Sequence, residues 1–203
     1  MPLPTIRFYF DFASPYAYLA FHQLPKALEG LAYRVQYCPM SLGAIFKARQ
    51  TTSPVFQPEK RAWINRHCTW LAEQADLPFV MPAVHPFASV PWLRMALAAS
   101  PHGQPSRAVV EQLFAAIWQT GNNPDDADWR HSIWQSVAQN LPEVRSVDDA
   151  AVKTELFALS DQALAHGVFG APSCVLLQED GSSQLFWGME GLPMLRDALE
   201  KQQ

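Results

Sequence analysis

The amino-acid sequence predicts an α/β fold, and three observations support that prediction. Residues 5–12 alternate apolar and polar side chains as a strand does, a helical stretch follows at 15–29, and residues 31–39 alternate in part again. Near the other end, an apolar strand, a turn at 179–182 and a return strand lead into a last helical stretch at 191–201. Between these ends the chain is mainly helical. We expect the opening strand–helix–strand unit to form a parallel crossover.

The composition is that of a globular protein with a sizeable core. Of the 203 residues, 49% are hydrophobic and 17% are charged, which argues against global disorder. The net charge is −4 and no run of Lys or Arg exceeds two residues, so we expect no nucleic-acid partner. No apolar run is long enough to span a membrane, and we expect no membrane partner.

The cysteines and histidines suggest neither a disulfide framework nor a metal site. Three cysteines stand far apart and are odd in number, which fits a reducing cytoplasm. The N-terminus has no basic region followed by an apolar core, so we expect no secretory signal. Six histidines show no metal-ligand spacing, and we expect no metal.

The first helix begins at a serine followed by a proline. Ser14 is a plausible N-cap, and Pro15 suits the first helical position because its missing N–H would be unpaired there anyway. A strand that runs into a helix N-terminus brings free backbone N–H groups and the positive end of the helix dipole to one point. That point stabilises an anion such as a thiolate. The alternative is that Ser14 only caps the helix.

The middle of the chain consists of helices separated by proline-bearing loops. We expect a short helix or turn at 42–48, a loop at 51–58, a helix at 59–76, an extended connector at 78–91, and helices at 92–100, 105–120, 127–140 and 148–166. Residues 42–166 therefore form a predicted inserted helical domain, and residues 1–41 together with 167–203 form the other domain. Tryptophans at four positions either line an aromatic site or belong to the core: Trp63, Trp70, Trp92 and Trp187.

This order of elements resembles the thioredoxin-like fold (βαβ…ββα) with a large all-helical insertion. Ser14 and Ala17 stand where redox members of that fold carry the two cysteines of Cys-x-x-Cys. Both positions lack cysteine, which argues against a disulfide oxidoreductase. Ala171-Pro172 stands where the fold usually carries a cis-proline, before an apolar strand.

Within that fold, the chain resembles the 2-hydroxychromene-2-carboxylate isomerases and their relatives, the kappa-class glutathione transferases. The matching stretches cover nearly the whole chain and lie at 8–16, 42–47, 77–79, 165–172 and 186–188. The resemblance implies a glutathione-dependent isomerase of aromatic catabolism that acts on a small aromatic carboxylate. It also implies a homodimer.

The resemblance further implies roles for individual residues. Ser14 would hold the sulfur of glutathione as a thiolate, which adds reversibly to a conjugated substrate. Glutathione-binding roles would fall to Ser14, Lys47, Lys60, Ala171, Pro172 and Glu190, and substrate-binding roles to Tyr16, Lys47 and Trp187. Solvated surface lysines are the alternative for Lys47 and Lys60.

Two other functions stay open. One is a kappa-type glutathione transferase or peroxidase, which would use the same thiolate on another acceptor. The other is a non-catalytic thioredoxin-fold protein that binds a peptide or small acid. The segment at 189–191 keeps the second alternative open, because it reads Met-Glu-Gly where the family usually has Asn-Asp-Arg.

Overall fold

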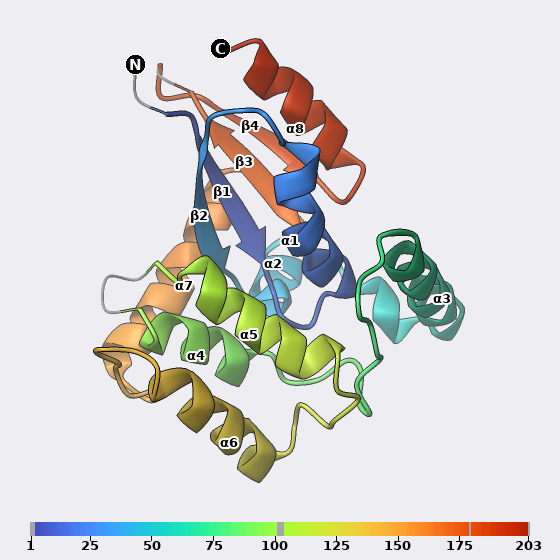
Figure 1. The fold of residues 1–203 in the computed structure, drawn as a ribbon, viewed down its shortest axis with the longest axis vertical. Helices are drawn as coiled ribbons and strands as arrows, with labels where there is room; N and C mark the ends of the chain where they lie inside the picture. The colour runs from blue at the N-terminus through green and yellow to red at the C-terminus, as the bar shows by residue number, and fades with distance from the viewer. Residues whose placement is uncertain (1–2, 101–103, 179, 203) are drawn as a thin grey trace.

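A four-stranded sheet with helices on both faces forms the centre of the molecule (Figure 1). A computed structural model describes residues 3–100, 104–178 and 180–202. The strands are β1 (Thr5–Phe10), β2 (Arg34–Pro39), β3 (Ser173–Leu177) and β4 (Ser183–Trp187), and their order across the sheet is β2-β1-β3-β4. β2 pairs parallel to β1, whereas β3 and β4 pair antiparallel. The predicted fold class is confirmed.

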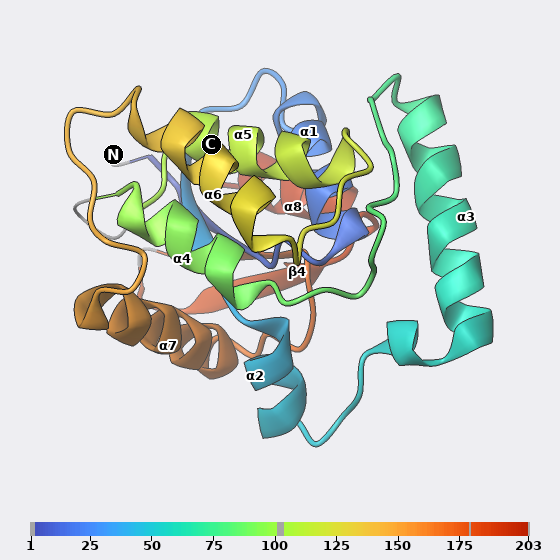
Figure 2. The same cartoon turned by 90° about the horizontal axis from the view of Figure 1, so that it is seen from below.

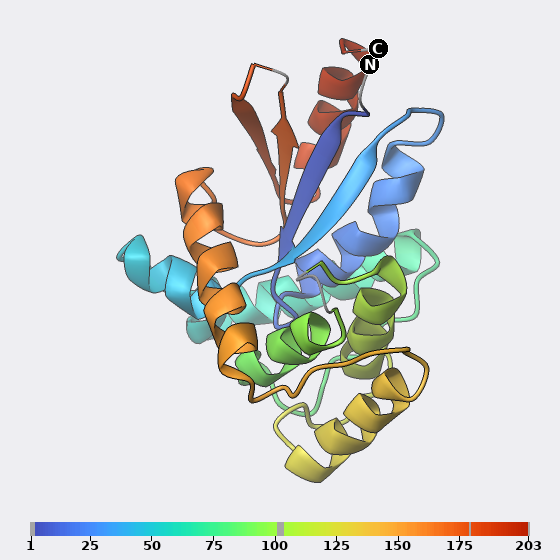
Figure 3. The ribbon, with the colours of Figure 1, turned by 90° about the vertical axis from the view of Figure 1, so that its left-hand side faces the viewer.

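The helices follow the expected order with ends shifted by a few residues. They are α1 (Pro15–Ala27), α2 (Leu42–Ala48), the 3-10 turn η1 (Pro54–Phe56), α3 (Pro58–Gln74), α4 (Val90–Ala98), α5 (Arg107–Trp118), α6 (Ala127–Ala138), α7 (Ala150–Ala165) and α8 (Gly191–Glu200). Helix α7 lies on one side of the sheet, and α1 and α8 lie on the other (Figure 3). In the described part of the chain, no helix combines the length and the apolar character that crossing a membrane requires.

The alternation along β1 assigns its side chains to two buried clusters. Phe8 and Phe10 belong to the larger cluster, which includes α1 and α8, whereas Tyr9 belongs to the smaller cluster on the α7 side. Successive side chains of a strand point to opposite faces, so the period-two pattern read from the sequence becomes the two-sided core.

The larger cluster continues from the sheet into the helical segment. The rings of Phe12 and Phe114 of α5 are 4.8 Å apart, and Trp118 of α5 donates its indole N–H to the carbonyl of Phe12 over 2.9 Å. The sheet and helices α4 and α5 therefore share one core. The domain boundaries at 41/42 and 166/167 stay a prediction.

Three expectations about individual elements need correction. β2 begins at Arg34 rather than at residue 31, because pairing starts where Thr5 of β1 lies opposite Arg34. The expected loop at 51–58 contains η1, in which the Ser53 hydroxyl accepts the N–H of Val55. Trp63 and Trp70 were expected to line an aromatic site or to belong to the core, but they are more than half exposed. They lie on helix α3, which stands at the edge of the molecule (Figure 2).

The exposure of these tryptophans follows from which face of α3 is buried. The buried residues of α3 are Ile64, Cys68 and Ala72, which repeat every four positions and form one stripe. Trp63 and Trp70 lie outside this stripe. Of the tryptophans that could belong to the core, Trp92 is fully buried.

The environment of His166, on the α7 side of the sheet, leads us to expect that the protein loses stability in acid. Arg7 donates to Nε2 of His166 over 3.0 Å. A guanidinium has no acceptor, so Nε2 must be unprotonated. Burial, and next the Arg7 charge, lower the pKa of His166 below its ordinary value of 6.5.

The unfolded chain therefore binds the proton more readily, and the free energy of unfolding falls as the pH drops below about 6.5. We expect urea midpoints between about pH 5 and pH 7.5 to depend less steeply on pH in His166→Gln than in the wild type. His131→Gln, at an exposed position of α6, is the matched control and should keep the wild-type slope. An unchanged slope in His166→Gln would contradict the prediction.

Candidate active site

Ser14 connects the start of α1 with the loop before β3. It is the N-cap of α1, and its hydroxyl oxygen accepts the N–H of Ala17 over 3.1 Å. The same hydroxyl donates to the carbonyl of Ala171 over 3.2 Å. The peptide bond between Ala171 and Pro172 is cis. Ser14 is only 6% exposed, so the capping role and a contact with the opposite loop coexist in one buried side chain.

Asp11 fixes the turn that carries Ser14. One carboxyl oxygen accepts the N–H of Ala13 over 2.9 Å, and the other accepts the N–H of Leu42 at the start of α2 over 2.8 Å. The residue is 1% exposed, and this burial raises the pKa of its carboxyl above the usual range. This role of Asp11 was not predicted from the sequence. The available signal was a carboxylate directly after an alternating strand and before the Ser14 turn.

His85, from the connector between α3 and α4, supports the same turn from the other side. Its Nε2 lies 3.0 Å from the carbonyl oxygen of Ala13 and must donate, because a carbonyl only accepts. Burial lowers the pKa of His85, which keeps the ring neutral. No local sequence pattern predicts this contact, since 72 positions separate the two residues.

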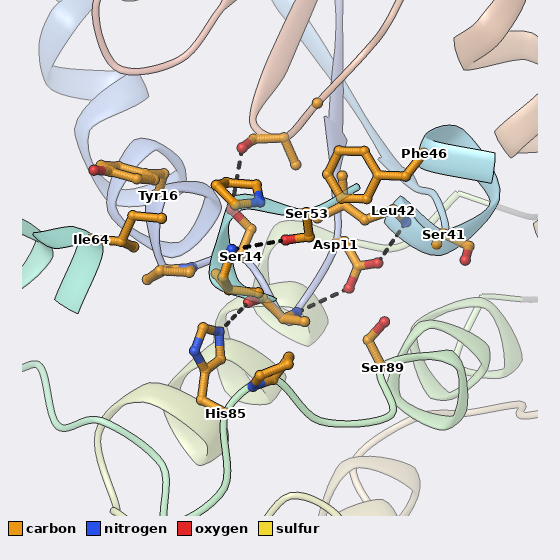
Figure 4. A pocket seen from close by; sticks show the side chains of 18 of the residues that line it. Asp11, Ser14, Tyr16, Ser41, Leu42, Phe46, Ser53, Ile64, His85 and Ser89 are labelled. Carbon is orange, nitrogen blue, oxygen red and sulfur yellow. Dashed lines mark hydrogen bonds between the residues drawn. The ribbon is translucent and has the colours of Figure 1, made fainter. Parts of the chain in front are cut away.

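These groups lie at a cavity of about 460 Å³. Side chains from α1, α2, α3 and the connector gather around Ser14 (Figure 4). The wall is mostly apolar and aromatic, with a few polar groups, as is typical of small-molecule sites. Its polar members are Asp11, Ser14, Ser41, Ser53, His85 and Ser89, besides the hydroxyl-bearing Tyr16.

The structure brings half of the predicted site residues together. Ser14, Tyr16, Ala171 and Trp187 all line the cavity. The other predicted residues are Lys47, Lys60, Pro172 and Glu190, and none of them is among the lining residues that the structure describes. Lys47, Lys60 and Glu190 are exposed and Pro172 is buried. Their binding roles stay predictions.

Tyr16 joins the cavity wall to α3. Its hydroxyl oxygen lies 2.8 Å from Nδ1 of His67, in hydrogen-bond contact. Burial raises the pKa of the Tyr16 phenol well above its ordinary value, so the phenol stays protonated at neutral pH. Trp63 and Trp70 stack on either side of His67 on the outer surface of α3 and are not lining residues in the described part of the chain.

Gly170 makes room for Trp187, and a substitution there tests the cavity wall. A Cβ at Gly170 would lie 2.7 Å from the indole Nε1 of Trp187, closer than real contacts allow. Trp187 is half exposed, so we expect Gly170→Ala to shift the indole outward and to leave the melting temperature nearly unchanged.

A changed tryptophan emission and a several-fold weaker affinity for an aromatic ligand would report that shift. The matched control is Gly43→Ala. Apart from its chain neighbours and its own helix backbone, the nearest atom to the new Cβ would be Ser41 Oγ, at an ordinary contact distance of 3.7 Å. Wild-type emission and affinity in Gly170→Ala would show that Trp187 does not depend on this glycine.

Comparison with known proteins places this geometry in a family. The profile of the DSBA-like thioredoxin domain matches residues 5–200. The chain belongs to this family. A 2-hydroxychromene-2-carboxylate isomerase of Sphingobium xenophagum is 29% identical over 199 residues, which cover 96% of this chain and 97% of that protein. Glutathione S-transferase kappa 1 of Caenorhabditis elegans is 22% identical over 211 residues, covering 99% and 93%.

A solved structure shows the same fold. A 2-hydroxychromene-2-carboxylate isomerase superimposes with a TM-score of 0.76 at 22% identity, over 98% of this chain and 95% of that one. Relatives named as isomerases and as glutathione transferases thus match nearly the whole chain, and the resemblance drawn from the sequence is confirmed. Among the residues that the structure describes, no group of three or more His, Cys, Asp or Glu could hold a metal ion.

Proposed function

We propose that this protein is a glutathione-dependent isomerase in which Ser14 holds the thiolate of glutathione against a conjugated aromatic substrate. The observation that carries the proposal is the position of the Ser14 hydroxyl. It lies at the N-terminus of α1, beside the Ala171 carbonyl and in the wall of an aromatic-lined cavity. The isomerase and transferase names of the relatives support the same function.

The groups around Ser14 suit glutathione, which is a tripeptide with a thiol. Bound glutathione would supply a nucleophilic sulfur that adds to the substrate and leaves again, so the overall reaction has no redox change. Ser14 keeps its oxygen on the N–H of Ala17 and can rotate its proton from the Ala171 carbonyl toward a sulfur anion. The carbonyl is then free to accept a peptide N–H. The end of α1 adds its dipole to the stabilisation of the anion.

The remaining predicted residues would act around this centre. Pro172 would fix the Ala171 backbone, and Glu190 would accept from the ammonium of the γ-glutamyl group. Lys47 and Lys60 are exposed on α2 and α3 and would meet glutathione carboxylates outside the cavity. Tyr16 and Trp187 would contact the substrate, which the isomerase relatives suggest is an aromatic carboxylate. We expect a cytoplasmic location, as the cysteine usage predicts, and a homodimer, as the family resemblance implies.

The kappa-type relative favours one alternative function. A glutathione transferase or peroxidase would use the same Ser14-held thiolate on an electrophile or a peroxide. The two reactions differ in their products. An isomerase returns all of the glutathione, whereas a transferase consumes it.

A calorimetric titration with reduced glutathione tests the proposal. We expect binding that weakens about 10- to 100-fold in Ser14→Ala, because a charge-assisted hydrogen bond contributes roughly 1.5–3 kcal/mol. Glu190→Gln should weaken binding less, since Glu190 is exposed. No heat and no change in tryptophan emission at millimolar glutathione would refute the glutathione enzyme and favour a binding protein for a peptide or small acid.

A further inference from the structure

The cavity wall offers rings on several sides of Ser14. Phe46 comes from α2, Phe56 from η1, Phe87 from the connector and Trp187 from the end of β4. Phe87 is buried, whereas Phe56 is 70% exposed and Trp187 50% exposed. A ligand that reaches Ser14 must therefore pass and contact aromatic surface that is only partly covered in the protein alone.

The polar groups of the cavity wall suit an uncharged oxygen of a ligand, such as a carbonyl oxygen. The hydroxyl oxygens of Ser41 and Ser53 each accept a backbone N–H, from Ala44 and Val55 respectively. Neither hydroxyl is recorded as a donor in the described structure, so each keeps a proton that it can donate to a ligand carbonyl. These donors carry no charge.

The ionisable groups of the wall are Asp11, Tyr16 and His85, and none of them provides a positive charge. Asp11 already accepts two backbone N–H groups. Burial lowers the pKa of His85 and keeps its ring neutral, outweighing the contact with the Ala13 carbonyl, which favours the charged form. Among the lining residues that the structure describes, none is Lys or Arg. Lys47 and Lys60 belong to elements that contribute to the wall, but both residues are exposed and neither is among the lining residues that the structure describes.

We propose that the cavity takes an uncharged aromatic electrophile, such as an aryl-conjugated ketone or ester, in preference to an aromatic carboxylate. This inference rests on the proposed glutathione chemistry at Ser14 and departs from the aromatic carboxylate that the isomerase relatives suggest. A carboxylate in this cavity would lose its hydration beside the Asp11 carboxyl without gaining a cation. An uncharged carbonyl would lose little hydration and would gain hydroxyl donors and ring contacts.

Binding of a matched pair tests the preference without any reaction. Cinnamate and methyl cinnamate share the ring and the conjugated carbonyl and differ in charge. In calorimetric titrations of the protein alone, we expect methyl cinnamate to bind at least about 30-fold more tightly. Equal or tighter binding of cinnamate would overturn the inference and would leave the role of Ser14 untouched.

Turnover separates this inference from the function on which it rests. Benzylidenepyruvate and its methyl ester are compared in the presence of glutathione, each rate being divided by the uncatalysed rate. A catalysed preference for the ester of about 100-fold or more supports the inference. A preference for the acid refutes it but supports a glutathione enzyme. No catalysis of either compound refutes the proposed function, whatever the binding data show.

A charge placed in the wall gives a positive test. Phe46→Lys introduces an ammonium group at a lining position of α2. We expect it to improve binding of cinnamate at least tenfold and to weaken binding of methyl cinnamate. The matched control, Phe46→Met, keeps the wall apolar and should keep the ester preference. If Phe46→Lys does not raise cinnamate affinity although circular dichroism shows a folded protein, missing positive charge is not what excludes the acid.

Discussion

Replacement of Ser14 by alanine is expected to lower glutathione-dependent turnover about 100- to 1,000-fold, which is the usual effect of removing one donor to a developing anion. The hydroxyl of Ser14 is the group that the structure aims at the Ala171 carbonyl from the N-terminus of α1. Alanine cannot donate to a sulfur anion, so the thiol of bound glutathione should also ionise at higher pH. Steady-state kinetics and the ultraviolet absorbance of the thiolate, each recorded against pH, measure the two effects.

Loss of the helix cap must be separated from loss of the donor. Ser14→Ala removes the bond to the N–H of Ala17, which costs about 1 kcal/mol of stability. Ser106→Ala is the matched control, because Ser106 caps α5 through the N–H of Val109 and is not a lining residue in the described part of the chain. It should lose similar stability and keep wild-type turnover.

Ser14→Thr retains a hydroxyl and should retain part of the activity. Wild-type turnover in Ser14→Ala would remove the thiolate role and leave Ser14 as a helix cap only.

Replacement of Trp118 by alanine is expected to cost about 3–5 kcal/mol in the free energy of unfolding, the range for deleting a buried aromatic side chain. Trp118 is fully buried, its ring stacks on Phe79 at 5.7 Å, and it lies edge-on to His85 at 5.5 Å. Its N–H also satisfies the carbonyl of Phe12, two residues before Ser14. The variant should therefore loosen the Ser14 turn as well as the core. Equilibrium unfolding in urea measures the first effect, and glutathione titration measures the second.

Two variants divide the Trp118 effect into its parts. Trp118→Phe keeps most of the ring volume and loses the N–H, so it should cost about 1–3 kcal/mol for the unpaired Phe12 carbonyl. Trp70→Ala removes the same side chain from an exposed position of α3 and should change stability by less than about 0.5 kcal/mol. A cost below about 1 kcal/mol for Trp118→Ala would contradict the continuous core between the sheet and α5.

Much of the fold could be read from local patterns. The alternation along Thr5–Phe10 predicted a strand, and Ser14 with Pro15 predicted the start of α1. Both signals depend on neighbours within a few residues, so a single sequence contains them. The start of β2 was less well predicted because strand ends depend on the partner strand, here on the pairing of Arg34 with Thr5.

Part of the candidate site could also be predicted. Ser14 and Ala171 lie 157 positions apart and are in hydrogen-bond contact. The resemblance of the whole chain to a family predicted that both belong to one binding site. Tyr16 and Trp187 were named in the same way and line the same cavity. Asp11 and His85 were missed, because their contacts with the Ser14 turn come from tertiary packing and leave no local pattern.

The sequence by itself determined the order of strands and helices, the serine cap of α1 and the missing redox cysteines, because each of these is a property of adjacent residues. Only the tertiary structure decided which face of α3 is buried, which aromatic rings reach the cavity and which lysines do not. These features depend on how elements that are distant in the sequence pack against one another. A periodic pattern reports which face of one element is apolar, but it does not report which other element covers that face. The charge of the cavity wall, on which the proposed class of substrate rests, is decided at this level.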